Sequence, residues 1–448
     1  MARKLFGTDG VRGIAGEFLT ADLALALARA ASQRAGAAKP RVLVIRDTRE
    51  SGEMLEAAVA AGIAAAGGEA LLGGVLPTPA APLLIRRYGL DLGVVLSASH
   101  NPYRDNGIKF FAGDGYKLSD EVELEIERAL ESPNGSVGAI GRVRTLQGAL
   151  EDYLRALHER FAELDLSGRR IALDCANGAS YRVAPEAFRR LGAEVEVVAA
   201  APDGRNINDG CGSTHVEALA THVREHGHDA GFAFDGDGDR VLAVDRTGTV
   251  VDGDELIALA ALHLRAGGRL PGGGVAVTVM TNYGFHTAMR DAGVEVATTP
   301  VGDRYVLEAL RERGWALGGE QSGHIIDTGF VPSGDGIAAA LLTLEALAGG
   351  DLADRHAMEK LPQRLVNVAF DDRAALTRAV ESIAADVDAE AAALAGRGRV
   401  LVRPSGTEPL VRVMVEAPRS EEADAVCRRL AAAVEDAADS RAGFCGEQ

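Results

Sequence analysis

Short aliphatic runs alternate along the chain with longer amphipathic stretches. Residues 41–45 and 93–96 are Val- and Leu-rich runs of strand length, and residues 51–66 between them form an Ala-rich stretch of helix length. Thr20 stands where it would cap another helix, expected over residues 21–35. Continuous apolar runs separated by helices are typical of parallel strands that are covered on both faces of a sheet. The pattern therefore predicts an α/β fold.

The same alternation recurs twice further along the chain. Runs of strand length occur at residues 170–173 and 231–234, and again at residues 275–279 and 315–317. Each run leads into a polar loop that contains glycine. We therefore predict that the first three quarters of the chain form three similar α/β domains with mixed or parallel sheets.

The last segment has a different pattern. Runs of strand length at residues 366–370, 399–403 and 410–416 accompany amphipathic stretches at 373–393 and 420–437. This β-α-β-β-α order predicts a small α+β domain at the C-terminus. The predicted domains span residues 1–150, 151–255, 256–365 and 366–448.

Composition and charge limit the classes of molecule that the chain is expected to bind. The 448 residues are 47% hydrophobic and 25% charged, and 47 Lys and Arg against 65 Asp and Glu give a formal net charge of −18. The hydrophobic content is typical of a globular protein with several cores. A negative surface repels nucleic acid and anionic membranes, so neither is an expected partner. An anionic small ligand would need locally concentrated positive charge.

Cysteine spacing and hydropathy bear on location. The four cysteines form no CxxC pair, which favours neither a disulfide framework nor a zinc knuckle. No apolar signal-peptide region follows Met1, and the longest uncharged apolar stretch, residues 70–85, contains prolines and is too short to span a bilayer. We therefore expect a cytoplasmic protein.

A loop of alternating aspartate and glycine follows one predicted strand. Asp235, Asp237 and Asp239 are separated by single glycines, which let the backbone curl so that the carboxylates converge. Carboxylate oxygens suit Mg²⁺ or Mn²⁺. A calcium EF-hand is excluded because Arg240 and Arg246 stand at its sixth and twelfth positions, which need Gly and Glu. The loop is at a strand's carboxyl end, so we favour a metal site over a solvated acidic turn.

A second polar loop, residues 97–102, follows another predicted strand. Ser99 lies beside His100, so it is either a nucleophile or the cap of the following turn. The chain has no G-x-S-x-G elbow, which disfavours an esterase. Together with a carboxylate metal site, the serine becomes a candidate phosphoryl carrier, because phosphoryl transfer needs mainly positioning and charge neutralisation.

Donor groups are concentrated near the C-terminus in Arg403, Ser405, Gly406, Thr407 and Arg412. Guanidinium groups, hydroxyls and backbone N–H groups match the acceptors of a phosphate. The alternative is an ordinary hairpin with surface arginines. On so acidic a chain, we favour phosphate binding.

Two further loops carry weaker signals. Residues 319–324 could present Glu320 and Ser322 to sugar hydroxyls, and residues 6–13 place Arg12 in a flexible loop. The chain contains neither a Walker A loop nor a GxGxxG fingerprint, so kinases and nicotinamide-dependent enzymes lack their expected markers.

In their order and spacing, these loops resemble those of the α-D-phosphohexomutases, and the resemblance covers essentially the whole chain. The segments that carry it are residues 97–102, 235–240, 319–324 and 403–408. Residues 6–13, residues 301–305 and Gln321 resemble the branch of that family that acts on glucosamine phosphates.

The resemblance implies domains arranged around a central cleft, each contributing one loop. Ser99 would be the phosphorylated residue, and one of its phosphate oxygens would share Mg²⁺ with Asp235, Asp237 and Asp239. Sugar hydroxyls would be held by Glu320 and Ser322. The distal phosphate would be held by Arg403, Ser405, Gly406, Thr407 and Arg412. The transferring phosphoryl group would be surrounded by Arg12, Lys109, Arg240 and His324.

The reaction that the resemblance implies interconverts glucosamine 6-phosphate and glucosamine 1-phosphate, a step that supplies amino-sugar nucleotides and cell-wall precursors. Phospho-Ser99 would donate to the free sugar oxygen, and the 1,6-bisphosphate, which also serves as activator, would return its other phosphate. Two alternatives are a phosphomannomutase/phosphoglucomutase and a non-catalytic phosphosugar-binding protein. The latter would be expected to lose Ser99 or one aspartate, and all are present. The oligomeric state stays open, a homodimer included.

Overall fold

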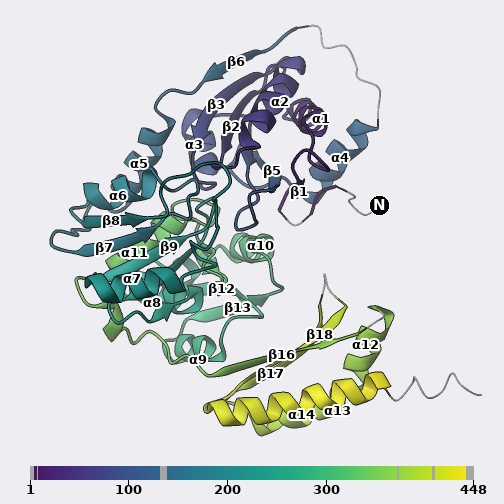
Figure 1. Cartoon of the computed structure of the whole chain (residues 1–448), viewed down its shortest axis with the longest axis vertical. Helices are drawn as coiled ribbons and strands as arrows, with labels where there is room; N and C mark the ends of the chain where they lie inside the picture. Colours follow the sequence, from purple (N-terminus) through teal and green to yellow (C-terminus); the bar gives the residue numbers. More distant parts are fainter. Residues whose placement is uncertain (1–4, 8, 132–138, 371–372, 406–408, 440–448) are drawn as a thin grey trace, which may run out of the picture. The chain divides into compact units, whose positions relative to one another are not determined.

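The structure, a computed structural model, describes residues 5–7, 9–131, 139–370, 373–405 and 409–439 (Figure 1). Its Cα positions divide the chain into two compact units. Unit 1 comprises Met1–Met280 and Ala292–Ala357, and unit 2 comprises Thr281–Asp291 and Met358–Gln448. Each unit is described below by itself.

The first sheet of unit 1 has the strand order β1-β5-β4-β2-β3-β6. The central strands β2, β3 and β4 are parallel, whereas β5 is antiparallel to both β4 and β1, so the sheet is mixed as predicted. Its strands are β1 (Val11–Ile14), β2 (Arg41–Arg46), β3 (Glu69–Val75), β4 (Leu92–Leu96), β5 (Asp105–Ala112) and β6 (Arg142–Thr145). Its helices are α1 (Ala21–Ser32), α2 (Gly52–Ala65), α3 (Ala80–Tyr88) and α4 (Asp120–Leu130).

Helix α1 shows how the local sequence sets an element's ends. The Thr20 hydroxyl accepts a hydrogen bond from the Leu23 N–H, as expected of an N-cap. The helix ends at Ser32, three residues before the predicted end. Gly36 follows with a positive φ of +75°, a conformation that glycine adopts readily.

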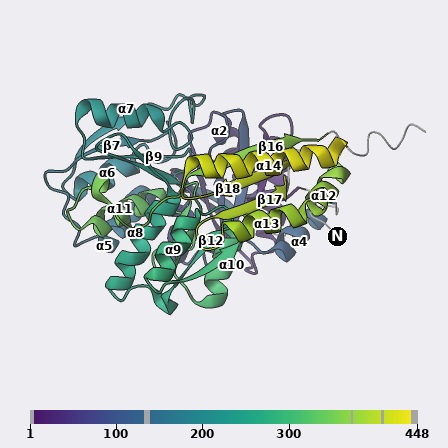
Figure 2. The ribbon, with the colours of Figure 1, turned by 90° about the horizontal axis from the view of Figure 1, so that it is seen from below.

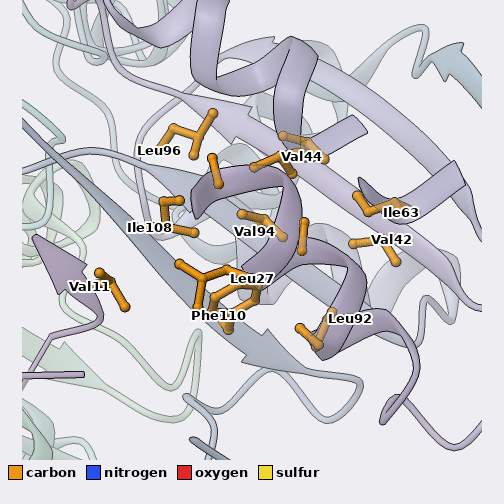
Figure 3. Packing of buried hydrophobic residues seen from close by; sticks show 14 of the residues in the cluster. Val11, Leu27, Val42, Val44, Ile63, Leu92, Val94, Leu96, Ile108 and Phe110 are labelled. Carbon is orange, nitrogen blue, oxygen red and sulfur yellow. The ribbon is translucent and has the colours of Figure 1, made fainter. Parts of the chain in front are cut away.

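Buried aliphatic residues join this sheet to its helices (Figure 3). Val42, Val94 and Phe110 on the sheet pack with Leu27 of α1 and Ile63 of α2, and all are at most 4% exposed. Burying such a side chain contributes about 1.5–3 kcal/mol. This packing fixes the strands, and with them the loops that leave their carboxyl ends.

Unit 1 contains two further mixed sheets, of order β11-β10-β9-β7-β8 and β13-β12-β14-β15. The strands of the first are β7 (Arg170–Asp174), β8 (Glu194–Val198), β9 (Ala230–Phe234), β10 (Val241–Asp245) and β11 (Val250–Val251). Those of the second are β12 (Gly274–Thr278), β13 (Glu295–Thr299), β14 (Leu317–Gly319) and β15 (Ile325–Asp327). The helices around them are α5 (Ala149–Arg160), α6 (Val183–Arg190), α7 (Glu217–His226), α8 (Gly253–Ala266), α10 (Asp303–Arg313) and α11 (Gly336–Leu347).

Strand β14 begins two residues later than the strand predicted at 315–317. The Trp315 N–H donates to Leu310 O and so closes the end of α10, which removes it from the sheet ladder. The strand instead includes Gly318 and Gly319, which pair with β12. A Cβ on Gly318 would lie 2.4 Å from Ala276 O, so this close pairing requires glycine.

Unit 2 is built on an antiparallel sheet of order β16-β18-β17. Helix α14 packs on β16 and β18 and runs along this sheet (Figure 2). Its strands are β16 (Gln363–Ala369), β17 (Arg399–Pro404) and β18 (Leu410–Glu416), and its helices are α9 (Tyr283–Asp291), α12 (Arg373–Ser382), α13 (Ala384–Ala393) and α14 (Ser420–Asp439). Within the described ranges, no helix has the length and apolar character to cross a membrane.

The prediction of one helix over residues 373–393 is wrong, because the chain forms α12 and α13 with a break at Ile383. The Ser382 hydroxyl donates to Ala379 O, a local bond that competes with continued helix geometry. Ile383 itself is 3% exposed and belongs to the core of unit 2. The break therefore turns an apolar side chain into the core.

Candidate active site

The Ser99 loop leaves the carboxyl end of β4 in a strained conformation that side-chain hydrogen bonds hold. Ser99 has φ of +52°, which costs a residue other than glycine roughly 1–2 kcal/mol. The Ser97 hydroxyl donates to Asp47 Oδ2 at 2.6 Å and accepts from the Ser99 N–H at 2.9 Å. Ser99 Oγ, in a residue only 2% exposed, donates to Asp235 Oδ2 at 2.5 Å. The structure thus brings together the two loops that the sequence predicts for carrier and metal.

A buried arginine holds this loop in place. The Arg49 Nη2 donates to Ser99 O at 2.9 Å and to Asn101 O at 2.8 Å, and its Nε donates to Asp47 Oδ2 at 2.9 Å. Asn208 Nδ2 adds a second donor to Ser99 O at 2.9 Å. The sequence analysis missed Arg49 and Asn208. Arg49 lies just beyond the carboxyl end of β2, next to β4 in the sheet, and that position was the available signal.

The aspartate loop follows β9. Oxygens of Asp235, Asp237 and Asp239 lie within 4.8 Å of one another, and all three residues are at most 7% exposed. Burial, together with the charges of Asp239 and Asp237, raises the pKa of Asp235 well above its usual range. Gly236 permits the close approach to the serine loop, since a Cβ there would lie 2.6 Å from Ser99 O.

The chemistry of this oxygen set fits a divalent cation. Asp237 Oδ1 is buried and accepts no hydrogen bond from the described residues. Buried carboxylates that repel one another are stabilised by a bound cation, and oxygen ligands are those that Mg²⁺ prefers. Asp235, Asp237 and Asp239 are therefore the residues that could hold the metal.

Lys109 is a buried cation that pairs with one of these carboxylates. Its Nζ is 2.8 Å from Asp237 Oδ2 and 3.0 Å from Asp9 Oδ2, and the residue is 2% exposed. Burial would lower the pKa of Lys109, but Asp237 and Asp9 raise it above its usual range. Asp9 also pairs with Lys117 at 2.6 Å and with Arg12. The sequence analysis missed Asp9, although it lies in the loop that was singled out for Arg12.

A cavity of about 440 Å³ opens over Ser99. Arg12, Arg240 and His324 line it together with Ser99 and Glu320. Burial would lower the pKa of His324, but Asp239, 3.6 Å away, raises it to about 8, so this imidazole is positively charged at neutral pH. The cavity combines a hydroxyl with several cations, an arrangement that suits a phosphate ester.

The predicted sugar loop reaches this cavity only in part. Glu320 lines it and its Oε1 accepts from the Gly302 N–H at 3.0 Å. Ser322 is exposed and is not among the lining residues of the described chain. Gln321 instead turns toward Asp252, with its Nε2 3.2 Å from Oδ2. Glu320 and His324 are thus the members of this loop that line the cavity.

In unit 2, Arg403 of β17 lies directly opposite Arg412 of β18. Burial and the charge of Arg412 lower the pKa of Arg403, the cost of holding two guanidinium groups side by side. Ser405 follows and is 7% exposed, whereas the predicted contributors Gly406 and Thr407 lie outside the described residues. A bound anion would relieve this repulsion, so the pair is suited to phosphate.

Known proteins resemble the chain over almost its whole length. Four phosphoglucomutase/phosphomannomutase domain families match it: α/β/α domains I, II and III at residues 3–135, 151–248 and 252–365, and the C-terminal domain at residues 365–433. A phosphoglucosamine mutase from Moorella thermoacetica is 52% identical over 429 residues, with 94% of this chain and 96% of that protein covered. One from Thermobifida fusca is 50% identical over 443 residues, with 97% and 98% covered.

Solved structures extend the likeness in fold. A phosphoglucomutase/phosphomannomutase family protein from Burkholderia thailandensis superposes with a TM-score of 0.82 at 23% identity, covering 97% of this chain and 98% of that one. The Aspergillus fumigatus N-acetylphosphoglucosamine mutase in complex with GlcNAc-6P and magnesium gives a TM-score of 0.67 at 20% identity, with 97% and 96% covered. At these identities the likeness concerns the fold alone.

Proposed function

We propose that this chain, which belongs to the phosphoglucomutase/phosphomannomutase family, is the enzyme that interconverts glucosamine 6-phosphate and glucosamine 1-phosphate. One observation carries the proposal: a buried serine hydroxyl lies 2.5 Å from a cluster of carboxylates, in a cavity lined by cations. Relatives about half identical over more than nine tenths of the chain bear the name phosphoglucosamine mutase.

In the proposed first half-reaction, phospho-Ser99 donates to the free hydroxyl of the sugar monophosphate. The bond from phosphorus to Ser99 Oγ breaks as the bond to the sugar oxygen forms, and the sugar's hydroxyl proton ends on Oγ. The resulting 1,6-bisphosphate turns in the cavity, and its other phosphate returns to Ser99 by the reverse step. A bisphosphate supplied from outside would restore the phosphate on Ser99, which makes it an activator.

The residues around Ser99 have distinct proposed roles in this transfer. Arg12, Arg240 and protonated His324 would stabilise the negative charge of the transferring group, the main requirement of phosphoryl transfer. Asp235, Asp237 and Asp239 would hold Mg²⁺, which when bound supplies further positive charge at the phosphoryl group. Lys109, paired with Asp237 and Asp9, holds the carboxylates in position.

Substrate contacts are proposed for both units. Glu320, at the cavity wall, would accept hydrogen bonds from sugar hydroxyls, and Ser322 would join it if the loop moved on binding. Arg403, Ser405, Gly406, Thr407 and Arg412 would hold the phosphate that is not reacting. The proposed domains are residues 1–150, 151–255, 256–365 and 366–448. A cytoplasmic location and a homodimeric state stay predictions.

The choice of sugar tests the proposal. Glucosamine phosphate carries an amine at carbon 2, and Asp303 and Glu320 supply carboxylates at the cavity wall. A hydrogen bond to a charged group contributes about 1.5–3 kcal/mol, or roughly ten- to a hundredfold in kcat/KM. We expect kcat/KM for glucosamine 6-phosphate to exceed that for glucose 6-phosphate and mannose 6-phosphate by this factor, measured in coupled assays with the same bisphosphate activator. A preference for mannose 6-phosphate would contradict the choice of sugar, and no turnover of any of the three would contradict the mutase proposal.

The arginine pair of unit 2 should govern substrate affinity in both directions. Arg403→Ala removes a charge-assisted contact to the phosphate that does not react, so KM for each monophosphate should rise by about tenfold or more. Arg364→Ala is the matched control, because Arg364 is an exposed arginine of the neighbouring strand β16 that pairs with Asp424 at 3.2 Å. Unchanged KM values in both directions of the Arg403→Ala enzyme would place the phosphate site elsewhere.

A further inference from the structure

Unit 1 contains a second group of metal-ligand side chains, separate from the aspartate loop. Glu196 lies on β8, His222 lies on α7 and His228 follows the end of that helix. His228 precedes the start of β9, whereas Asp235 follows its end. The two groups are therefore at opposite ends of the same strand, and the proposed mutase reaction uses no residue of the second.

The distances in this group suit a shared ion. The Nε2 of His222 lies 3.1 Å from Glu196 Oε1, and the Nε2 of His228 lies 3.0 Å from Glu196 Oε2. One ligand atom from each of the three residues lies within 4.8 Å of the others. Two ligands bound to one tetrahedral zinc at about 2.0–2.1 Å are roughly 3.3 Å apart. The carboxylate thus already lies at nearly the spacing of zinc ligands from each of the two imidazoles.

Hydrogen bonding leaves the two imidazoles unexplained. His228 is 3% exposed, and its Nε2 lies 3.0 Å from Glu196 Oε2, whereas its Nδ1 has no hydrogen-bond partner among the described residues. The Nε2 of His222 is also buried without such a partner. Buried polar groups are nearly always satisfied, because an unsatisfied one costs free energy. A metal ion would satisfy these nitrogens.

A neighbouring histidine packs on one of the two imidazoles. His226 stacks on His222 with ring centroids 4.1 Å apart, and its Nδ1 lies 3.0 Å from His222 O. This packing orients the His222 ring without placing His226 in the ligand set.

We propose that Glu196, His222 and His228 form a binding site for a first-row transition metal, with Zn²⁺ the ion that two imidazoles and a carboxylate fit best. Strand β8 is at the edge of its sheet and pairs with β7 among the described strands. A bound ion would link this edge strand to the C-terminal end of α7. Its role would be to stabilise unit 1, independently of the proposed mutase reaction.

Zinc binding to matched variants of the full-length protein tests the proposal. The probe is Zn²⁺ itself, added to chelator-treated protein in excess Mg²⁺ and counted after dialysis. We expect wild type to bind about one more Zn²⁺ per chain than His222→Ala, and Glu196→Gln to bind it roughly tenfold or more weakly. Zn²⁺ should raise the Tm of wild type but not that of His222→Ala. The Asp237→Asn variant should still bind this Zn²⁺, because Asp237 belongs to the aspartate loop and not to the group of Glu196, His222 and His228.

The matched control is His263→Ala. His263 also lies near a carboxylate, with its Nε2 3.4 Å from Glu345 Oε2, but Arg269 Nη2 already lies 2.6 Å from that nitrogen. The His263→Ala variant should therefore bind Zn²⁺ as wild type does. Equal zinc stoichiometry and affinity in wild type and His222→Ala would overturn the proposal, as would an equal loss in His263→Ala. Mutase activity does not enter this measurement, so its outcome is independent of the proposed function.

Discussion

Ser99→Ala should reduce kcat by about 10³-fold or more while the protein keeps its fold. The substitution removes the oxygen that would carry the phosphoryl group, and loss of a covalent carrier removes both half-reactions at once. The change in stability should be small, because the backbone hydrogen bonds of residue 99 stay and only the contacts of Ser99 Oγ to Asp235 and to the neighbouring His100 are lost. Turnover in both directions and Tm are the measurements.

Ser97→Ala is the control for this experiment. Ser97 is equally buried and belongs to the same loop, but its hydroxyl bonds to Asp47 and to the Ser99 N–H rather than facing the aspartate loop. Intact mass should show a phosphate on wild type and on Ser97→Ala that exchanges with labelled substrate, and none on Ser99→Ala. Full activity of Ser99→Ala would refute its role as carrier.

A single rule indicates from the sequence that each of these two loops lies at a functional edge of its sheet. Ser99 and Asp235 each follow a buried strand, and ligands of open α/β sheets bind at the carboxyl ends of strands. The two strands belong to different sheets, β4 and β9, so the rule predicts a polar edge for each but not the contact between them. That contact depends on Gly236, which lets the aspartate loop approach Ser99 O, and on packing that no local pattern encodes.

The residues that the sequence analysis missed share a physical cause. Arg49 and Asn208 act through side-chain bonds to backbone carbonyls that lie far away in the sequence, and no spacing rule connects them to Ser99. Asp9 is similar, because its partners Lys109 and Lys117 lie far from it in the sequence. Long-range polar partners of this kind become visible only when the chain is folded.

The hydrophobic periodicity of the sequence predicts which helices and strands form better than it predicts where they begin and end. The helix of residues 420–437 and the strands at 170–173 and 231–234 occur close to their predicted limits. The break at Ile383 was missed, because residues 373–393 keep a helical pattern through it. A hydroxyl bond at Ser382 and the burial of Ile383 decide the break, and both are features of tertiary packing.

Asp237→Asn should lower kcat by about 10²-fold or more and weaken the dependence on Mg²⁺. The three aspartates share one ion in the proposed site, so removing any of them disables the same metal site. The fold-loss of kcat in the double variant Asp237→Asn/Asp239→Asn should therefore be much smaller than the product of the two single fold-losses. Chelation should abolish wild-type turnover and Mg²⁺ should restore it, whereas the variants should need more Mg²⁺ for half-maximal rate.

Asp245→Asn is the control variant: it removes a buried carboxylate that lies outside the metal site. Asp245 is 3% exposed, lies at the end of β10 and pairs with Arg355 at 3.0 Å, outside the aspartate loop. Removing one partner of a buried pair costs about 3–5 kcal/mol, so this variant should lose stability and keep the Mg²⁺ requirement of wild type. Asp237→Asn also breaks a buried pair, with Lys109 Nζ at 2.8 Å, so it too should lose stability, but of these two variants it alone should weaken the dependence on Mg²⁺, because it removes a ligand. Normal turnover by chelator-treated wild type would contradict the metal site and would leave the aspartate loop as an acidic turn.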